Sequence, residues 1–380
     1  MKKKYIIFSI VTLVLLVALI TSFNYFKTSN NYVEDSVNNQ TKITKGISMN
    51  LEQTVGAGDY KQVTQSSWPT EGYKFNAELS KCENGGEISW DDTKKAVIVS
   101  GNLSDKCYVY FDIYQLTLAE YIKSQYTGTQ GDNALYYHNS TLTNGAGDNS
   151  YRYAGASDSV NNYICLGSDA TTCPDANLFR IIGVFGNQTK VIRAKSVGDQ
   201  QWHTSADNTW SSSSLNAYLN GTYLTSLGTI AEKIATTTWK VGGCSWSNIK
   251  TSVPKIVYKN EVGSSASTTT VDKKIGLMYV SDYFYSASPS AWTLVGYNES
   301  DATKDYRAAT STNWLYLGSY EWTISCLSES TDYAFYVDST GYVDLDLVTS
   351  SYAVRPSFNL EFSVKYVSGS GSMSDPVRVN

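Results

Sequence analysis

The sequence predicts an α+β protein with an N-terminal transmembrane helix, a small antiparallel β-domain and a larger mixed domain rich in β-hairpins with a few short helices. Three observations support this fold class. The N-terminus carries an uncharged apolar run, aromatic residues make up 13% of the chain against 17% charged residues, and short aromatic or β-branched runs alternate with turn residues. At 380 residues the chain exceeds one typical domain, which favours an anchor followed by two folded units.

The N-terminal apolar run covers residues 5–26 and follows Lys2, Lys3 and Lys4. These 22 residues, at about 1.5 Å each in a helix, cross the ~30 Å core of a bilayer. Because the lysines precede the run, the positive-inside rule predicts a cytoplasmic N-terminus and extracellular C-terminal domains. We therefore expect a single-pass protein of the cell membrane, with the membrane as a partner. A cleaved signal peptide is the alternative.

The rest of the chain divides by composition. Polar residues without periodicity follow the anchor, short strand-like runs separated by turns such as Asn84-Gly85-Gly86 come next, and Thr117 and Glu120 have the spacing of a helix capping box. The predicted segments are 1–27 for the signal anchor, 28–55 for a disordered tether, 56–113 for the small β-domain, 114–129 for a helical connector and 130–380 for the larger domain.

The larger segment contains two hairpin patterns and two helical patterns. Residues 177–185 and 190–194 flank a turn, as do residues 332–337 and 342–347, and residues 353–362 supply a further strand. Leu215, Tyr218 and Leu219 have helical spacing and predict a helix over 213–220; Ile230 and Ile234 predict another over 230–236.

A set of short motifs occurs in order over roughly residues 115–365. The motifs are Tyr151-Arg152-Tyr153-Ala154-Gly155, Asn177-Leu178-Phe179-Arg180-Ile181-Ile182-Gly183-Val184-Phe185, Trp210-Ser211-Ser212-Ser213-Ser214-Leu215 with Leu219-Asn220-Gly221-Thr222-Tyr223-Leu224, Ile275-Gly276-Leu277-Met278-Tyr279-Val280-Ser281-Asp282-Tyr283, Glu321-Trp322-Thr323-Ile324-Ser325 and Val354-Arg355-Pro356-Ser357-Phe358. Together they resemble an uncharacterised extracellular domain family of gut Firmicutes surface proteins. More distantly, they are similar to domains of the C-type-lectin-like or sulfatase-modifying-factor fold.

This resemblance implies a C-type-lectin-like architecture for residues 130–380. It does not extend to catalysis, because activating members of the sulfatase-modifying group use a reactive cysteine pair near the C-terminal end. Here only Cys326 follows Trp322. A fold without the chemistry of its site does not imply the activity.

Six cysteines in an exported chain favour disulfides, although sequence alone leaves the connectivity open. We expect local pairing; reduced thiols are the alternative. The expected pairs are Cys82 with Cys107, Cys165 with Cys173 and Cys244 with Cys326.

The inventory of reactive residues predicts no catalytic site, metal site or cofactor. General acid–base catalysis favours histidine or paired carboxylates, and the two histidines, His138 and His203, are expected to be polar surface residues. Asp338, Asp344 and Asp346 suggest calcium, but a solvated strand face and turn explains them equally well. A net charge of −5 excludes an extended basic face for nucleic acid.

Recognition is the better functional hypothesis. The segment 281–313 is rich in Tyr, Ser, Gly and Asn, a mixture typical of binding loops. Exposed rings of Tyr283, Tyr285, Trp292 and Tyr297 would stack on sugars or anchor a protein partner, whereas core packing would give each ring a purely structural role. We expect a non-catalytic, membrane-anchored bacterial cell-surface protein that binds glycan or surface-protein ligands. The alternatives are a structural cell-envelope component and a degenerate enzyme of the sulfatase-modifying-factor-like fold.

Overall fold

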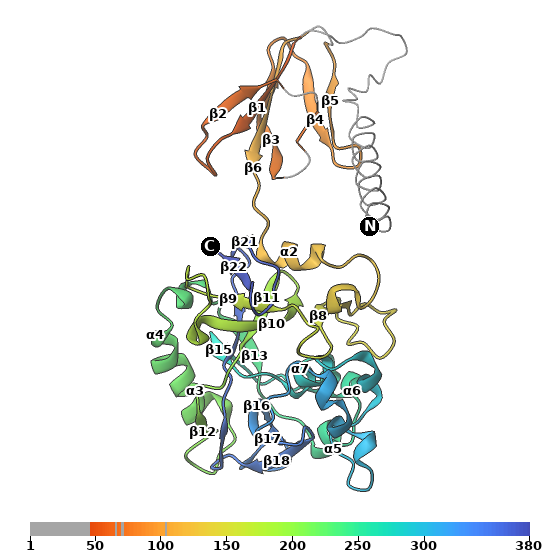
Figure 1. Ribbon diagram of the computed structural model, residues 1–380, viewed down its shortest axis with the longest axis vertical. Helices are drawn as coiled ribbons and strands as arrows, with labels where there is room; N and C mark the ends of the chain where they lie inside the picture. The colour runs from red at the N-terminus through yellow and green to blue at the C-terminus, as the bar shows by residue number, and fades with distance from the viewer. Residues whose placement is uncertain (1–45, 65–66, 70–71, 103–104) are drawn as a thin grey trace, which may run out of the picture. The chain divides into compact units, whose positions relative to one another are not determined.

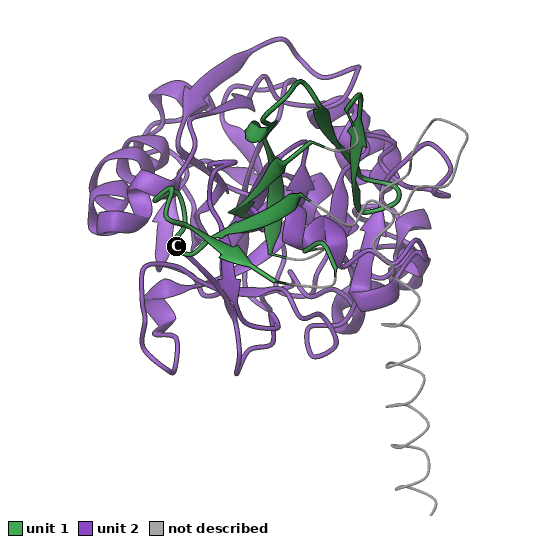
Figure 2. Cartoon of the chain, turned by 90° about the horizontal axis from the view of Figure 1, so that it is seen from above, with its two compact units in different colours: residues 1–115 green, residues 116–380 purple. Residues whose placement is uncertain are grey.

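A computed structural model describes residues 46–64, 67–69, 72–102 and 105–380 (Figure 1). The chain forms two compact units, the first ending at Gln115 and the second spanning Leu116–Asn380 (Figure 2). The apolar segment 5–26 and most of the predicted tether lie outside the described residues.

The predicted fold class and localisation need correction. The described residues are mostly β-strands with short helices, and α6, Pro254–Glu261, has only eight residues. Such short helices are marginal alone and depend on tertiary packing. Because strands dominate the described residues, the expected α+β fold class is wrong. Within the described ranges no helix has both the length and the apolar character needed to cross a bilayer. A single-pass membrane protein with a cytoplasmic N-terminus is therefore not supported.

The first unit is a mixed sheet rather than the antiparallel domain predicted. Its strand order is β2-β1-β6-β3, and β1 pairs with β6 in parallel. Met49 lies opposite Val109 and Leu51 opposite Phe111, which places four buried apolar side chains in one core. The bounds are β1 Ile47–Glu52, β2 Tyr60–Val63, β3 Tyr73–Cys82 and β6 Cys107–Ile113, with a separate hairpin of β4 Glu87–Asp91 and β5 Ala96–Ser100.

Strand β1 occupies residues predicted to be a disordered tether. Its apolar residues Ile47, Met49 and Leu51 alternate with polar ones, and two of the polar residues, Asn50 and Glu52, are also buried. Successive side chains of a strand point to opposite faces, so the apolar residues that pack in this core occur only at every second position. The tether prediction is therefore wrong from Ile47 onward.

The second unit is built around a large mixed sheet with the order β15-β20-β11-β10-β9-β22-β21; β8 pairs with β10, and β7 with β8. The predicted hairpin at 177–194 is confirmed as β10 and β11. The strands are β7 Leu135–Tyr137, β8 Tyr151–Tyr153, β9 Tyr163–Cys165, β10 Leu178–Phe185, β11 Gln188–Arg193, β15 Ile275–Gly276, β20 Ser357–Leu360, β21 Tyr366–Ser368 and β22 Val377–Val379.

A second sheet of this unit has the order β12-β19-β16-β17-β18. Its β17–β18 hairpin confirms the pattern predicted at 332–347. The strands are β12 Asp199–Gln201, β16 Glu321–Cys326, β17 Tyr333–Val337, β18 Val343–Leu347 and β19 Ser351–Ala353, and a separate pair is formed by β13 Thr237–Lys240 and β14 Thr270–Lys273.

The helices are short and pack between or beside these sheets (Figure 1). The predicted capping box at Thr117 and Glu120 is confirmed and starts α2, whose Leu118 and Ile122 are buried in the core of the second unit. The helix predicted over 230–236 is instead a 3-10 turn, Gly228–Lys233. The α-helices are α2 Leu118–Ser124, α3 Ser214–Tyr218, α4 Leu224–Ser226, α5 Trp246–Lys250, α6 Pro254–Glu261 and α7 Val280–Tyr285.

Two of the three expected disulfides are present, Cys82–Cys107 and Cys165–Cys173. The third is not formed: Cys244 and Cys326 are buried free thiols, although the Cys244 amide donates to the Cys326 carbonyl at 3.0 Å. Burial raises the pKa of Cys326 to about 11, so this thiol stays protonated at neutral pH and is a poor nucleophile.

The Cys82–Cys107 disulfide joins paired positions of β3 and β6 across 25 residues of sequence. We expect the double substitution Cys82→Ser/Cys107→Ser to lower the unfolding free energy of the first unit by about 3 kcal/mol, because it frees this loop in the unfolded chain. Urea unfolding, monitored by hydrogen exchange in peptides from each unit, measures this loss of unfolding free energy. The control Cys165→Ser/Cys173→Ser should destabilise only the second unit; equal effects of both variants on both units would contradict the prediction.

Candidate functional site

Three of the four aromatic residues predicted to bind a ligand lie in the interior. Tyr283, Tyr285 and Trp292 are 0%, 1% and 0% exposed. Residues 280–285 form helix α7, all of whose side chains are buried, rather than an exposed loop. The Tyr285 hydroxyl donates to the Asn144 carbonyl at 3.1 Å and the Trp292 indole to the Ala287 carbonyl at 2.9 Å. The prediction of an exposed patch is therefore wrong for these three residues.

The two histidines, both expected at the surface, lie in different environments. His138, predicted at the surface, is fully buried, and its Nδ1 accepts a hydrogen bond from the Ala146 amide at 3.1 Å. Burial, and then the charge of Arg152, lowers the pKa of His138 well below its usual range. His203 is half-buried, and its Nδ1 accepts from the Ser205 amide. His138 is thus a neutral core residue.

The three aspartates considered for calcium all have protein partners. Asp338 accepts bonds from the Thr340 amide and hydroxyl, both at 2.7 Å. Asp344 pairs with Lys250, and Asp346 accepts from the Tyr352 hydroxyl. Across the described ranges, no cluster of three His, Cys, Asp or Glu side chains is arranged to hold a metal.

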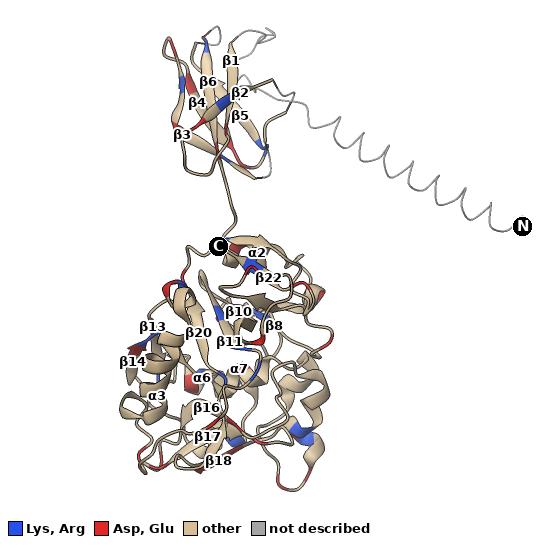
Figure 3. Ribbon diagram, turned by 60° about the vertical axis from the view of Figure 1, so that its left-hand side comes forward, with Lys and Arg blue, Asp and Glu red and all other residues tan. Residues whose placement is uncertain are grey.

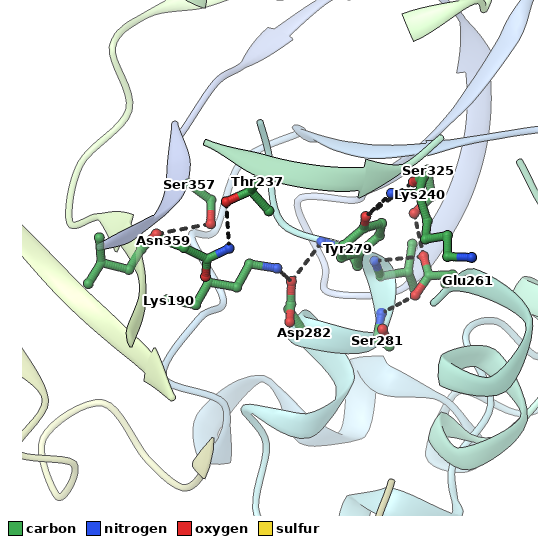
Figure 4. A network of polar contacts seen from close by, with 12 residues as sticks. Lys190, Thr237, Lys240, Glu261, Tyr279, Ser281, Asp282, Ser325, Ser357 and Asn359 are labelled. Atoms are coloured by element: carbon green, nitrogen blue, oxygen red, sulfur yellow. Dashed lines mark hydrogen bonds and ion pairs between the residues drawn. The ribbon is translucent and has the colours of Figure 1, made fainter. Parts of the chain in front are cut away.

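A buried polar network joins the large sheet to α7 (Figure 4). Lys190 of β11 and Asp282 of α7 form an ion pair at 2.5 Å, with side chains only 7% and 3% exposed. The Asp282 carboxylate also accepts a hydrogen bond from the Tyr279 backbone amide at 2.9 Å. The Lys190 ammonium lies 4.7 Å from the centre of the Tyr279 ring. A buried charge is costly unless it is paired and hydrogen-bonded, and here both requirements are met.

Glu261 of α6 extends this network to the second sheet. Its carboxylate accepts hydrogen bonds from the backbone amides of Val280 and Ser281, at 3.0 and 2.7 Å. It also accepts a hydrogen bond from the hydroxyl of Ser325 on β16. Burial raises the pKa of Glu261. A degenerate enzyme would need titratable groups that converge in a cleft, whereas these converge in the core. Their arrangement supports a structural role.

Helix α7 in turn fixes the turn between β17 and β18. The Tyr283 hydroxyl donates to the Gly341 carbonyl at 2.8 Å, and a Cβ at Gly341, whose φ is +101°, would lie 2.3 Å from the Thr310 side chain. Tyr342, the next residue, is half-exposed at the end of this turn. The buried network therefore determines where Tyr342 is presented.

Tyr342 belongs to a surface that we call the tyrosine face, made of the partly exposed Tyr297, Tyr320, Tyr342 and Tyr352. The rings of Tyr297 and Tyr342 are 4.7 Å apart, and those of Tyr320 and Tyr352 are 5.2 Å apart. Buried Tyr336 supports the second pair, at 5.8 Å from Tyr320 and 4.9 Å from Tyr352. Tyr320, at 44% exposed, is the most accessible ring.

Charged groups connect the two ring pairs. Asp344 lies opposite Tyr336 in the β17–β18 register and pairs with Lys250, whose ammonium is 4.6 Å from the centre of the Tyr297 ring. Burial, and then the carboxylates of Asp338 and Asp344, raises the pKa of Tyr342 to about 12. Acidic and basic positions both occur around β17 and β18 in Figure 3. The face therefore combines protonated phenols, carboxylates and supporting cations.

Of the four predicted ligand residues, only Tyr297 lies on this face. Tyr320, Tyr342 and Tyr352 were missed, because they lie on different segments that only the second sheet brings together. A weak signal was present in β18, where Asp344 and Asp346 alternate with apolar residues and so share one side of a strand. Arrays of tyrosine rings with adjacent carboxylates are suited to stacking and hydrogen bonding with a polar ligand.

Residues 186–362 match the model of a family described as a domain of unknown function (DUF6273). This range is similar to that family and includes the buried network and the tyrosine face. None of the curated proteins and none of the solved structures matches the chain. The resemblance to extracellular Firmicutes domains and to the C-type-lectin-like fold stays a prediction.

The substitution Lys190→Met is expected to lower the unfolding free energy of the second unit by about 3 to 5 kcal/mol, because it leaves the buried Asp282 carboxylate without its cation. In the double variant Lys190→Met/Asp282→Asn the loss should shrink, since no unpaired charge remains. Urea unfolding of both variants measures the difference. A loss below about 1 kcal/mol for Lys190→Met would contradict the assigned role.

Because His138 resists protonation in the folded state, the unfolding free energy should decrease as the pH is lowered. An unfolded histidine binds a proton near pH ~6.5, so below that pH the unfolded state holds more protons than the folded state. The unfolding free energy then decreases by about 1.4 kcal/mol per pH unit until the folded pKa is reached. We expect His138→Gln to remove this component between pH ~6.5 and ~5.5, as measured by urea unfolding. Identical pH slopes for wild type and variant would contradict burial as the cause.

Proposed function

We propose that this chain is a non-catalytic recognition module that binds carbohydrate through the tyrosine face. The observation that carries the proposal is the set of four partly exposed tyrosine rings, two of which, Tyr320 and Tyr352, pack on buried Tyr336. The face lies inside the range that matches the family of unknown function.

Sugar rings suit this surface for two reasons. Their axial C–H groups pack on the flat faces of aromatic rings, and their hydroxyls bond to carboxylates and phenols, which tyrosine-rich binding surfaces supply at low entropic cost. Tyr320 offers an accessible ring face, while Asp344 and Asp346 lie on the same side of the adjacent hairpin. Each carboxylate already accepts a bond from a protein side chain, Lys250 for Asp344 and Tyr352 for Asp346, and its remaining lone pairs can accept a sugar hydroxyl hydrogen.

Rigid presentation also supports binding. Tyr352 is fixed by its hydroxyl bond to Asp346, and Tyr297 by the ammonium of Lys250 and the guanidinium of Arg307, 4.6 and 5.0 Å from its ring centre. Side chains already ordered in the free protein lose less entropy on binding. The two disulfides support an exported protein, because such bonds persist in oxidising compartments.

A glycan array followed by calorimetry of the best ligand tests the proposal. We expect Tyr320→Ala to weaken that ligand about tenfold, equivalent to about 1.4 kcal/mol, because it removes the most exposed ring. Tyr320→Phe, which keeps the ring, should lose less than the alanine variant.

Phe362→Ala is the matched control, since Phe362 is 65% exposed and is not part of the tyrosine face. It should bind like the wild type. Failure of every glycan to bind, or equal affinities for Tyr320→Ala and Phe362→Ala, would overturn the proposal. A protein ligand lost with Tyr320→Ala, in the absence of glycan binding, would replace carbohydrate by protein as the ligand class.

A further inference from the structure

A separate pocket of about 360 Å³ lies beside α2 in the second unit. Its walls come from distant parts of the sequence: Tyr121 and Gln125 belong to α2 and its end, Tyr153 to β8, Asn161 to the following loop, and Ser370 to the loop between β21 and β22. The volume is at the lower end of the range for small-ligand sites, roughly 300–1,000 Å³. The site is thus large enough for one small molecule.

The chemistry of the walls is neutral and polar. Every described residue that lines the pocket is uncharged, and most of them carry a hydroxyl or an amide. Hydroxyls and amides both donate and accept hydrogen bonds, so they match a ligand that does the same. A charged ligand would lose its hydration without gaining a counter-charge.

Tyr153 supplies the most deeply placed polar group of the pocket wall. Its side chain is 5% exposed and packs in the core of the second unit, yet it also lines the pocket. Within the described part of the chain its hydroxyl has no hydrogen-bond partner, and burial raises its pKa, which keeps the proton on the oxygen. The hydroxyl is not among the fully buried polar atoms that lack a partner, so it is accessible from the pocket, where a ligand hydroxyl can form a hydrogen bond with it.

Other residues of the pocket lining are held by contacts within the protein. The Tyr121 ring stacks on Tyr366 with centroids 3.6 Å apart, and its hydroxyl donates to the Gly369 carbonyl at 3.3 Å. Asn133 and Ala134 both have positive φ values, 55° and 56°, which non-glycine residues seldom adopt. The Asn133 amide donates to the Gln125 carbonyl at 2.8 Å and holds this conformation in place. The pocket is therefore preformed rather than a gap between mobile loops.

We propose that this pocket binds a neutral polyhydroxylated ligand of the size of a monosaccharide, with the Tyr153 hydroxyl as its buried anchor. The proposal does not depend on the tyrosine face, because the two sites share no residue. It also adds residues outside the range that matches the family of unknown function, such as Tyr121, Tyr153 and Ser370.

Saturation-transfer NMR and calorimetry on the full chain test this proposal. The probes are D-glucose, D-galactose and N-acetyl-D-glucosamine, with D-glucuronate and D-glucosamine as charged analogues. At least one neutral sugar should bind at least tenfold more tightly than its charged analogues. Tyr153→Phe keeps the core ring but removes the anchor, so it should weaken binding about tenfold. Asn161→Ala, at an exposed rim position, should weaken it by a smaller factor.

Phe362→Ala is the matched control and should leave this binding unchanged, because exposed Phe362 belongs neither to this pocket nor to the tyrosine face. The proposal is overturned if no neutral sugar binds, if the charged analogues bind as well, or if Tyr153→Phe has wild-type affinity. Loss of sugar binding in Tyr320→Ala with none in Tyr153→Phe would place the sugar on the tyrosine face alone. Melting temperatures of all variants show whether any loss reflects unfolding instead.

Discussion

The buried ion pair between Lys190 and Asp282 is the interaction on which the second unit depends. It links strand β11 of the large sheet to α7, while Glu261 links the start of α7 to Ser325 on the second sheet. Helix α7 has only six residues and would not be stable alone. Once it is fixed, Tyr283 holds the β17–β18 turn through Gly341. A polar core thus sets the position of an aromatic surface.

This organisation separates the charged groups that look reactive from those that can meet a ligand. Glu261, Asp282 and Lys190 have their hydrogen-bonding capacity taken up inside the protein. The tyrosine face presents partly exposed rings, and the pocket beside α2 is lined mainly by amides and hydroxyls. Such groups are suited to hydrogen bonding and stacking with polar ligands. The proposed recognition role rests on these surface groups and not on the buried ionisable ones.

Local sequence patterns predicted the hairpins, the capping box and two disulfides, because each depends on residues close in sequence or on turn chemistry. They failed for α7, where the run Val280–Tyr285 is buried on all sides and so shows no amphipathic period. They also failed for β1, whose buried face has few apolar residues. The tyrosine face was largely missed for another reason: strand pairing assembles Tyr320, Tyr342 and Tyr352, and sequence spacing does not encode that pairing.

The most direct test of the tyrosine face is hydrogen–deuterium exchange of the full chain with and without a bound glycan. Binding there predicts slower exchange in peptides covering residues 296–299, 318–322 and 340–354, with little change in the first unit. Protection confined to other regions, or unchanged exchange in these three segments at saturating glycan, would contradict the account.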